Sequence, residues 1–123
     1  MKIISIKNHG FLDYLTVALF ALIPSVFGFE GIPAYLSYGL AAIHLIMTLL
    51  TNFPMGAAKV IPVKLHKIVE TIVGPVLIVA PWLLGFSDNL TARYVFIAMG
   101  LIIIAVGLLT DYFSNQPVLK STP

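Results

Sequence analysis

Two histidines in this sequence are each followed, four residues later, by an acidic residue, and side chains of these two types can bind a metal ion or transfer a proton. His9 precedes Asp13 by four residues, and His66 precedes Glu70 by four residues. On an α-helix this spacing places both members of a pair on one face. If the two faces meet, two imidazoles and two carboxylates converge, which is a ligand set suited to a divalent metal ion or to a proton relay.

The same pairs also have a simpler interpretation, in which they are interfacial residues near helix starts. A negative charge is favoured there by the helix dipole, and Glu70 can pair with Lys67 or with His66. The pattern His-x-x-x-Asp/Glu is a weak motif, because a duplicated segment repeats it whether or not it has a role. The sequence alone therefore assigns no metal ion and no cofactor.

A third histidine, His44, lies about nine residues from either end of a long apolar segment. This position predicts a depth near the middle of a membrane. The side chain is either a haem ligand, a quinone-binding group or a proton carrier, or an interior histidine satisfied by a neighbouring hydroxyl or carbonyl, which we favour. A haem held by two histidines of one chain is disfavoured, because His9 and His66 are expected at a different depth. Small or weakly polar residues continue the helix face of His44: Ser37, Ala41, Thr48 and Asn52.

The chain that must position these residues is too apolar to be soluble. Of its 123 residues, 59% are hydrophobic and 10% are charged, the net charge is +2 and the mean hydropathy is +1.02. So few charges cannot solvate a surface around so much apolar side chain, which excludes soluble, disordered and nucleic-acid-binding proteins. The absence of cysteine excludes disulfides, thiolate metal sites and catalytic thiols.

Four apolar windows of about 19 to 20 residues are long enough to cross a hydrocarbon core about 30 Å thick. They must be helical, since lipid leaves backbone polar groups no other partners. The connections within each pair are short, so each pair forms an antiparallel hairpin. We predict an all-α polytopic membrane protein with four transmembrane helices, at 11–29, 34–52, 68–86 and 94–113.

Basic residues predict the orientation, because six lysines flank one side of these windows and Arg93 alone lies on the other. By the positive-inside rule both termini are cytoplasmic. Aromatic residues near the window ends are expected as interfacial anchors: Tyr14, Tyr35, Trp82, Tyr94 and Tyr112. The lysines are Lys2, Lys7, Lys59, Lys64, Lys67 and Lys120.

The sequence also contains an internal duplication. An offset of 57 aligns the first windows of the two pairs, and an offset of 59 aligns LLTNF (49–53) with LLTDY (108–112). We predict one membrane domain over 1–123, with repeat 1 at about 7–56, repeat 2 at about 62–113 and a tail at 114–123. Each repeat has an even number of spans, so the repeats are parallel and related by a pseudo-two-fold axis along the membrane normal. The offset of 57 pairs His9 with His66, Asp13 with Glu70, Pro24 with Pro81, Gly28 with Gly85 and Phe29 with Phe86.

The duplicated hairpin contains IPSVFGF (23–29) in the first repeat and APWLLGF (80–86) in the second. It resembles the SPW-repeat family of small bacterial membrane proteins, whose repeat is a pair of spans with Ser-Pro-Trp in the first. The resemblance covers about residues 7 to 113, with Ala80 at the motif serine and Ser25 at the motif tryptophan of the other repeat. It implies the bacterial inner membrane and no established activity. The motif positions are Pro24, Gly28, Phe29, Pro81, Trp82, Gly85 and Phe86.

Three functions remain open from the sequence. We favour a structural or accessory role, in which the chain is not an enzyme and associates with itself or with a larger membrane complex through small-residue faces. The first alternative is a small oligomeric transporter or channel, with a proton- or ion-coupled path lined by Asp13, His44 and Glu70. The second is a membrane protein that binds haem, metal or quinone. The expected partners are the lipid bilayer and another membrane protein chain, and nucleic acid is excluded.

Overall fold

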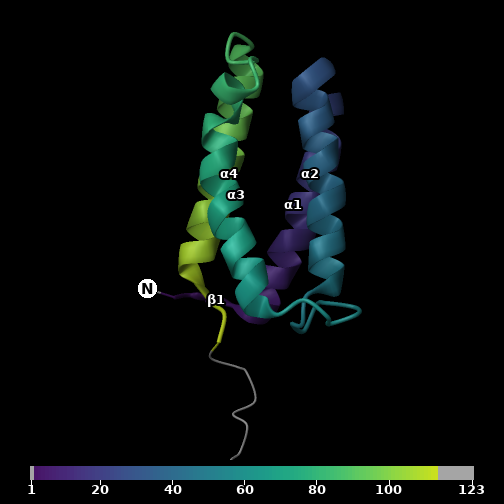
Figure 1. The fold of residues 1–123 in the computed structure, drawn as a ribbon, viewed down its shortest axis with the longest axis vertical. Coiled ribbons are helices and arrows are strands. Elements are labelled where there is room, and N and C mark those ends of the chain that lie inside the picture. Colours follow the sequence, from purple (N-terminus) through teal and green to yellow (C-terminus); the bar gives the residue numbers. More distant parts are fainter. Residues whose placement is uncertain (1, 114–123) are drawn as a thin grey trace, which may run out of the picture.

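The computed structural model describes residues 2–113, which form four α-helices arranged as two antiparallel hairpins (Figure 1). Lys120 and the predicted tail at 114–123 lie outside the described residues. The elements are β1 (Ile4–Ser5), α1 (Ile6–Phe27), α2 (Gly31–Leu50), α3 (Val63–Leu83), α4 (Leu90–Leu109) and β2 (Thr110–Asp111).

Every helix begins three to five residues before the start of its predicted apolar window and ends two to four residues before the end of that window. The starts of α1 and α4 are earlier because polar residues cap these helices: the Ser5 side chain accepts from the Asn8 amide at 3.1 Å, and the Asn89 side chain accepts from the Ala92 amide at 3.1 Å. Helices α2 and α3 have no such side-chain cap. The ends of α2 and α4 are earlier because Thr51 and Thr110 adopt extended backbone conformations. Hydropathy locates the apolar centre of a helix and misses its capped first turn.

Three of the four helices, α1, α2 and α4, are long and apolar enough to cross a membrane. The third helix, α3, is not a candidate span by the same criteria of length and apolar composition. It carries three charged residues, Lys64, Lys67 and Glu70, in its first two turns. The prediction of membrane-spanning helices is therefore confirmed for three of them.

The shared motif of the two repeats ends the first helix of each hairpin. Both glycines adopt the left-handed conformation, with φ of 66° at Gly28 and 78° at Gly85, which glycine accepts without strain. The amide after each glycine donates to the proline carbonyl five residues earlier, which is the Schellman arrangement of a helix C-terminus. These bonds are Phe29 to Pro24 at 2.9 Å and Phe86 to Pro81 at 2.8 Å.

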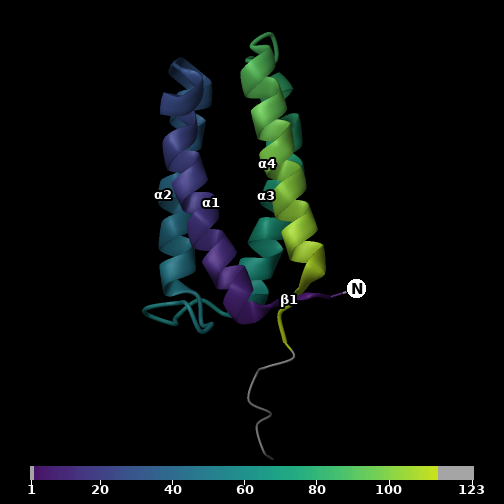
Figure 2. The ribbon, with the colours of Figure 1, turned by 180° about the vertical axis from the view of Figure 1, so that it is seen from behind.

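The helix ends place aromatic rings between the hairpins. Phe29 and Phe86 are buried and both pack on Phe96 of α4, with ring centroids 6.4 and 5.3 Å apart. The buried apolar side chains therefore form one cluster with members from both hairpins. The two hairpins themselves stand side by side in Figure 2.

Small residues allow close packing within each hairpin. On α2, Ser37, Ala41 and Thr48 are buried, and the Ser37 hydroxyl donates to the Phe20 carbonyl at 2.6 Å. On α4, a Cβ added at Gly100 would lie 2.6 Å from the Gly74 carbonyl oxygen. These small residues of α2 and α4 thus pack against the chain itself, whereas Asn52 of the same predicted face is exposed.

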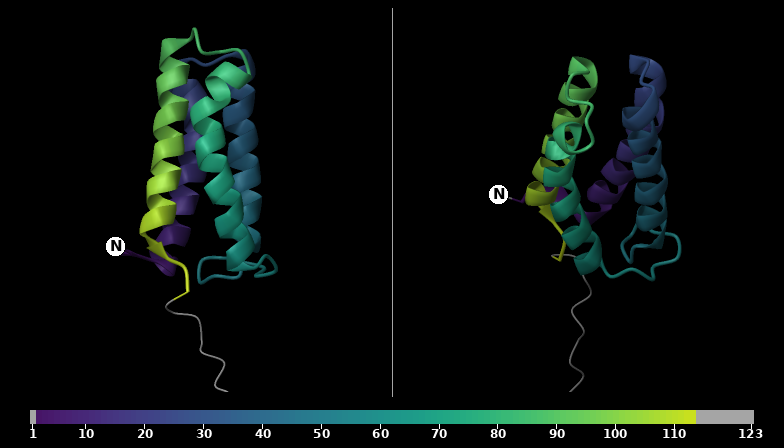
Figure 3. Two further views of the ribbon diagram at one scale, coloured as in Figure 1. Left: turned by 60° about the vertical axis from the view of Figure 1, so that its left-hand side comes forward. Right: turned by 45° about the horizontal axis from the view of Figure 1, so that its top comes forward.

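The ends of the two hairpins meet on the side where the first strand and the 51–62 loop lie (Figures 1 and 3). Strand β1 pairs in parallel with β2, with Ile4 opposite Thr110, and an isolated parallel bridge joins Ile61 to Thr51. Ile61 is Ile4 shifted by 57, and Thr110 is Thr51 shifted by 59. The start of each hairpin therefore pairs with the end of the other.

Candidate functional site

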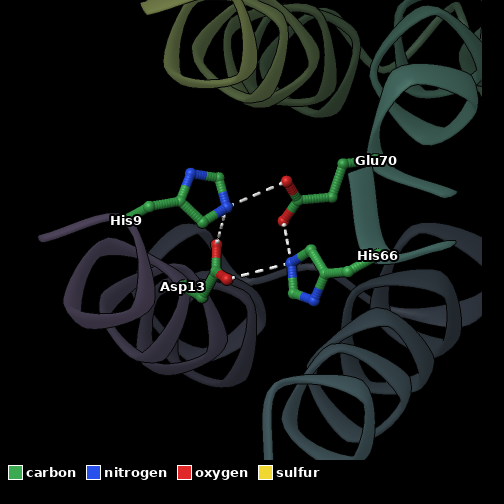
Figure 4. A group of neighbouring side chains, drawn as sticks. All are labelled: His9, Asp13, His66 and Glu70. Carbon is green, nitrogen blue, oxygen red and sulfur yellow. Dashed lines mark hydrogen bonds and ion pairs between the residues drawn. The ribbon is translucent and has the colours of Figure 1, made fainter. Parts of the chain in front are cut away.

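Two histidines and two carboxylates form a closed ring at this end of the molecule (Figure 4). His9 Nε2 lies 3.2 Å from Asp13 Oδ1 and 3.1 Å from Glu70 Oε2. His66 Nε2 lies 3.0 Å from Asp13 Oδ2 and 2.9 Å from Glu70 Oε1. Nitrogen and oxygen atoms therefore alternate around the ring, and each histidine contacts both acids.

The ring is buried and crosses between the hairpins. His9 and Asp13 lie in the first two turns of α1, and His66 and Glu70 lie in the first two turns of α3. Their exposed fractions are 1%, 3%, 1% and 5% in that order. Because ionisable groups in an apolar interior are costly without partners, the two inter-hairpin contacts, His9 to Glu70 and His66 to Asp13, tie α1 to α3.

A threonine from the opposite hairpin holds the far side of each imidazole. His9 Nδ1 lies 2.8 Å from Thr110 Oγ1, and His66 Nδ1 lies 2.7 Å from Thr51 Oγ1. Each threonine hydroxyl donates its proton to the backbone carbonyl four residues earlier, at 2.6 Å: Thr110 to Val106 and Thr51 to Met47.

These bonds assign the tautomer of both histidines. A hydroxyl whose proton is given to a carbonyl can only accept from the imidazole, so Nδ1 carries the proton in His9 and in His66. The Nε2 atom of each ring then faces the two carboxylates. This is how proteins orient histidines whose Nε2 has a further task, such as binding a metal ion.

Aromatic rings seal the same end of the molecule. Phe53 packs on His66 with centroids 5.6 Å apart, and Tyr112 packs on His9 at 4.9 Å. The Tyr112 hydroxyl donates to Glu70 Oε2 at 3.3 Å, and burial and the nearby carboxylates raise the pKa of Tyr112 well above its usual range. Tyr112 is only 2% exposed, so its prediction as an interfacial anchor is wrong.

His44 lies at the ring and not at a separate depth, which corrects the sequence prediction. Its Nε2 is 3.5 Å from Asp13 Oδ1 and 3.8 Å from Glu70 Oε1. The correction follows from the helix boundaries: α2 ends at Leu50, so His44 lies fewer than two turns from its end, beside the second turn of the antiparallel α1. A small cavity of about 10 Å³, about the size of one water molecule, adjoins these three side chains.

Three buried polar atoms of this site have no hydrogen bond of good geometry. Among residues 2–113, the buried side-chain atoms without such a bond are His9 Nε2, His44 Nε2 and Asp13 Oδ2. Each of the three atoms nevertheless lies 3.0 to 3.5 Å from a carboxylate oxygen or an imidazole nitrogen of the cluster, so each has an ion-pair partner there.

The residues that sequence analysis missed are Thr51, Thr110 and Tyr112. Their signal is present in the repeat, because LLTNF and LLTDY align at an offset of 59 and place a threonine at the same position of each hairpin. The pattern did not indicate their role, since each threonine contacts the histidine of the other hairpin.

Comparison with known proteins identifies the family. The family model of the SPW repeat domain matches residues 7–110. The chain belongs to the SPW repeat family. No curated protein and no solved structure shows a significant match to it.

The SPW motif positions lie away from the ring in this structure. Proline, glycine and phenylalanine of the motif form the helix ends described above, and Trp82 is 54% exposed on the outer surface of α3. In this SPW repeat protein the motif therefore shapes the hairpins, while the histidine and acid pairs form the polar site.

We expect the two threonines to be required for the stability of the ring. Thr110→Val or Thr51→Val keeps the side-chain shape but leaves a buried imidazole N–H without an acceptor, which costs about 1 to 3 kcal/mol. Thr71→Val is the matched control, because Thr71 is exposed and its hydroxyl also donates to the carbonyl four residues earlier. Thermal unfolding in detergent measures the difference. Equal midpoints for all three variants would contradict the assigned role.

Proposed function

We propose that this SPW repeat protein is a four-span structural subunit of the bacterial cytoplasmic membrane, without enzymatic activity. The observation that carries the proposal is the ring itself. Its four ionisable side chains contact one another across the two hairpins and are at most 5% exposed, and Glu70 also lines a cavity of about 310 Å³ bordered by α3 and α4. Their geometry supports a role in fixing the hairpins against each other.

The arrangement of the hairpins supports four spans with cytoplasmic termini. Helix α3 has 21 residues and α4 has 20, and the two pack antiparallel along their lengths (Figure 3). Lys59 and Lys64 lie at the end of the molecule that carries the ring, whereas Arg93 lies near the opposite end. A cytoplasmic location of the ring end satisfies the positive-inside rule.

The interior beyond the ring supports a structural rather than a transport role. In the described part of the chain the buried polar side chains gather near the ring, apart from Ser37, which is bonded to a backbone carbonyl. The remaining core is aliphatic and aromatic. A hydrophilic path through a single copy would need polar groups along its whole length.

A small oligomeric transporter or channel is the second candidate. It is favoured by the cavity beside Asp13, His44 and Glu70, which holds space for about one water molecule next to ionisable groups. A path would then have to be completed at an interface between copies.

The topology can be tested by cysteine labelling, since the natural sequence contains no cysteine. Ala57→Cys and Asp88→Cys place single thiols in exposed loops at opposite ends of the molecule. We expect a membrane-impermeant maleimide to label Asp88→Cys in spheroplasts and Ala57→Cys only after lysis. If α3 does not span, both positions will lie on one side and label together.

Flux and stoichiometry test the structural role against transport. In proteoliposomes we expect no proton or divalent-cation flux above that of empty vesicles. Native mass spectrometry of gently extracted membranes should show the chain in an assembly of fixed stoichiometry, with itself or with another subunit. A flux that is lost in Asp13→Asn and in Glu70→Gln but kept in the loop variant Glu30→Gln would contradict the structural proposal and favour the transporter.

A further inference from the structure

The geometry points to a metal site that goes beyond the structural role: the ring binds one divalent first-row transition-metal ion per chain. The ligands are Nε2 of His9 and of His66, with one carboxylate oxygen each from Asp13 and Glu70. Together these four residues can offer ligand atoms that all lie within 4.8 Å of one another.

The spacing of the ring matches the coordination sphere of such an ion. Bonds of about 2.0 to 2.2 Å to nitrogen and oxygen place neighbouring ligand atoms about 2.8 to 3.6 Å apart, for square-planar through tetrahedral arrangements. The four nitrogen-to-oxygen contacts of the ring measure 3.2, 3.1, 3.0 and 2.9 Å, and they join the two nitrogens to both oxygens of each carboxylate. One ion at the centre can therefore reach both nitrogens and one oxygen of each acid after a small movement of the side chains.

Hydrogen-bond accounting favours a cation at the centre over direct contacts alone. Since Nδ1 of each histidine donates to a threonine, a neutral imidazole turns a lone pair toward two carboxylates. Two nitrogens and four carboxylate oxygens would then converge, and the Tyr112 hydroxyl donates to only one of them, Glu70 Oε2. His9 Nε2 and Asp13 Oδ2 lie at ion-pair distances yet lack a hydrogen bond of good geometry in the described residues. A central cation accepts a lone pair from both nitrogens and from one oxygen of each carboxylate.

The charge and the surroundings also fit a divalent ion. Two carboxylates balance a charge of +2, so the loaded site is neutral in an apolar interior where uncompensated charge is costly. The threonine bond behind each imidazole is the outer-shell support that orients histidine ligands. Phe53 and Tyr112 close the site toward the cytoplasmic end.

The mixed donor set narrows the class of ion. Imidazole favours zinc, iron, copper and nickel, whereas purely carboxylate and water sites favour magnesium and calcium. Two nitrogens and two oxygens in a compact ring suit Zn²⁺ and ions that replace it, such as Co²⁺. His44 Nε2, 3.5 Å from Asp13 Oδ1, is positioned to turn toward the same ion as an additional ligand.

The test uses the full chain without an affinity tag, because a polyhistidine tag binds the same ions. After chelation, the purified protein is titrated with Co²⁺ and followed by its visible absorption, and then with Zn²⁺ as competitor. We expect one equivalent of Co²⁺ to produce a spectrum of low-symmetry, four- or five-coordinate cobalt, and Zn²⁺ to remove it. Zn²⁺ should also raise the thermal midpoint of the chelated protein, since an ion that binds only the folded state stabilises it.

Glu70→Gln removes one carboxylate with little change of shape. We expect this variant to bind Co²⁺ at least about 100-fold more weakly than wild type, because losing a ligand costs more affinity than losing a residue that only hydrogen-bonds to a ligand. Glu30→Gln, in an exposed loop, should bind as wild type does. A wild-type protein that binds no stoichiometric Co²⁺ or Zn²⁺ overturns the inference even if Glu70→Gln fails to fold. Equal affinity in wild type and Glu70→Gln also overturns it. Neither result affects the labelling and flux tests of the structural role.

Discussion

The structure depends on one constraint, which is that ionisable side chains inside an apolar bundle must satisfy one another. His9 and His66 each contact both acids of the ring, and each is held from behind by a threonine of the other hairpin. Removing any partner leaves a buried charge or donor exposed to an apolar environment, a far larger loss than a surface ion pair would give. The position of α1 against α3 follows from this network, and the aromatic core above it fills the remaining interface.

The two halves of the molecule make equivalent contacts, with two informative differences. Phe53 of the first half occupies the place that Tyr112 takes in the second, so only Glu70 receives a phenol hydrogen bond. Conversely, Ile103 of the second half stands at the position equivalent to His44, so only the first half places a third imidazole beside the ring. A ring built from duplicated parts therefore has a third imidazole and a small cavity on one side, at His44, and a phenol on another, at Tyr112.

Sequence reasoning recovered the helices, the hairpins and the pairing of each histidine with its acid, because periodicity and repetition are local signals. It placed His44 too deep relative to Asp13, since the apolar window of α2 runs two residues past the helix end at Leu50 and that of α1 begins five residues after the helix start at Ile6. It also missed the threonines behind the histidines. That contact links residues 101 positions apart in one case and 15 in the other, and only the packing of the two hairpins creates it.

The central claim, that the ring is one cooperative unit joining the hairpins, is tested most directly by a double-mutant cycle between His9 and Glu70. The free energy of unfolding in detergent is measured for wild type, His9→Gln, Glu70→Gln and the double variant. Residues of one buried network should show a coupling energy of about 1 to 3 kcal/mol, so that the second substitution costs much less than the first. Additive effects, within about 0.5 kcal/mol, would show that the two hairpins are not held together through these side chains.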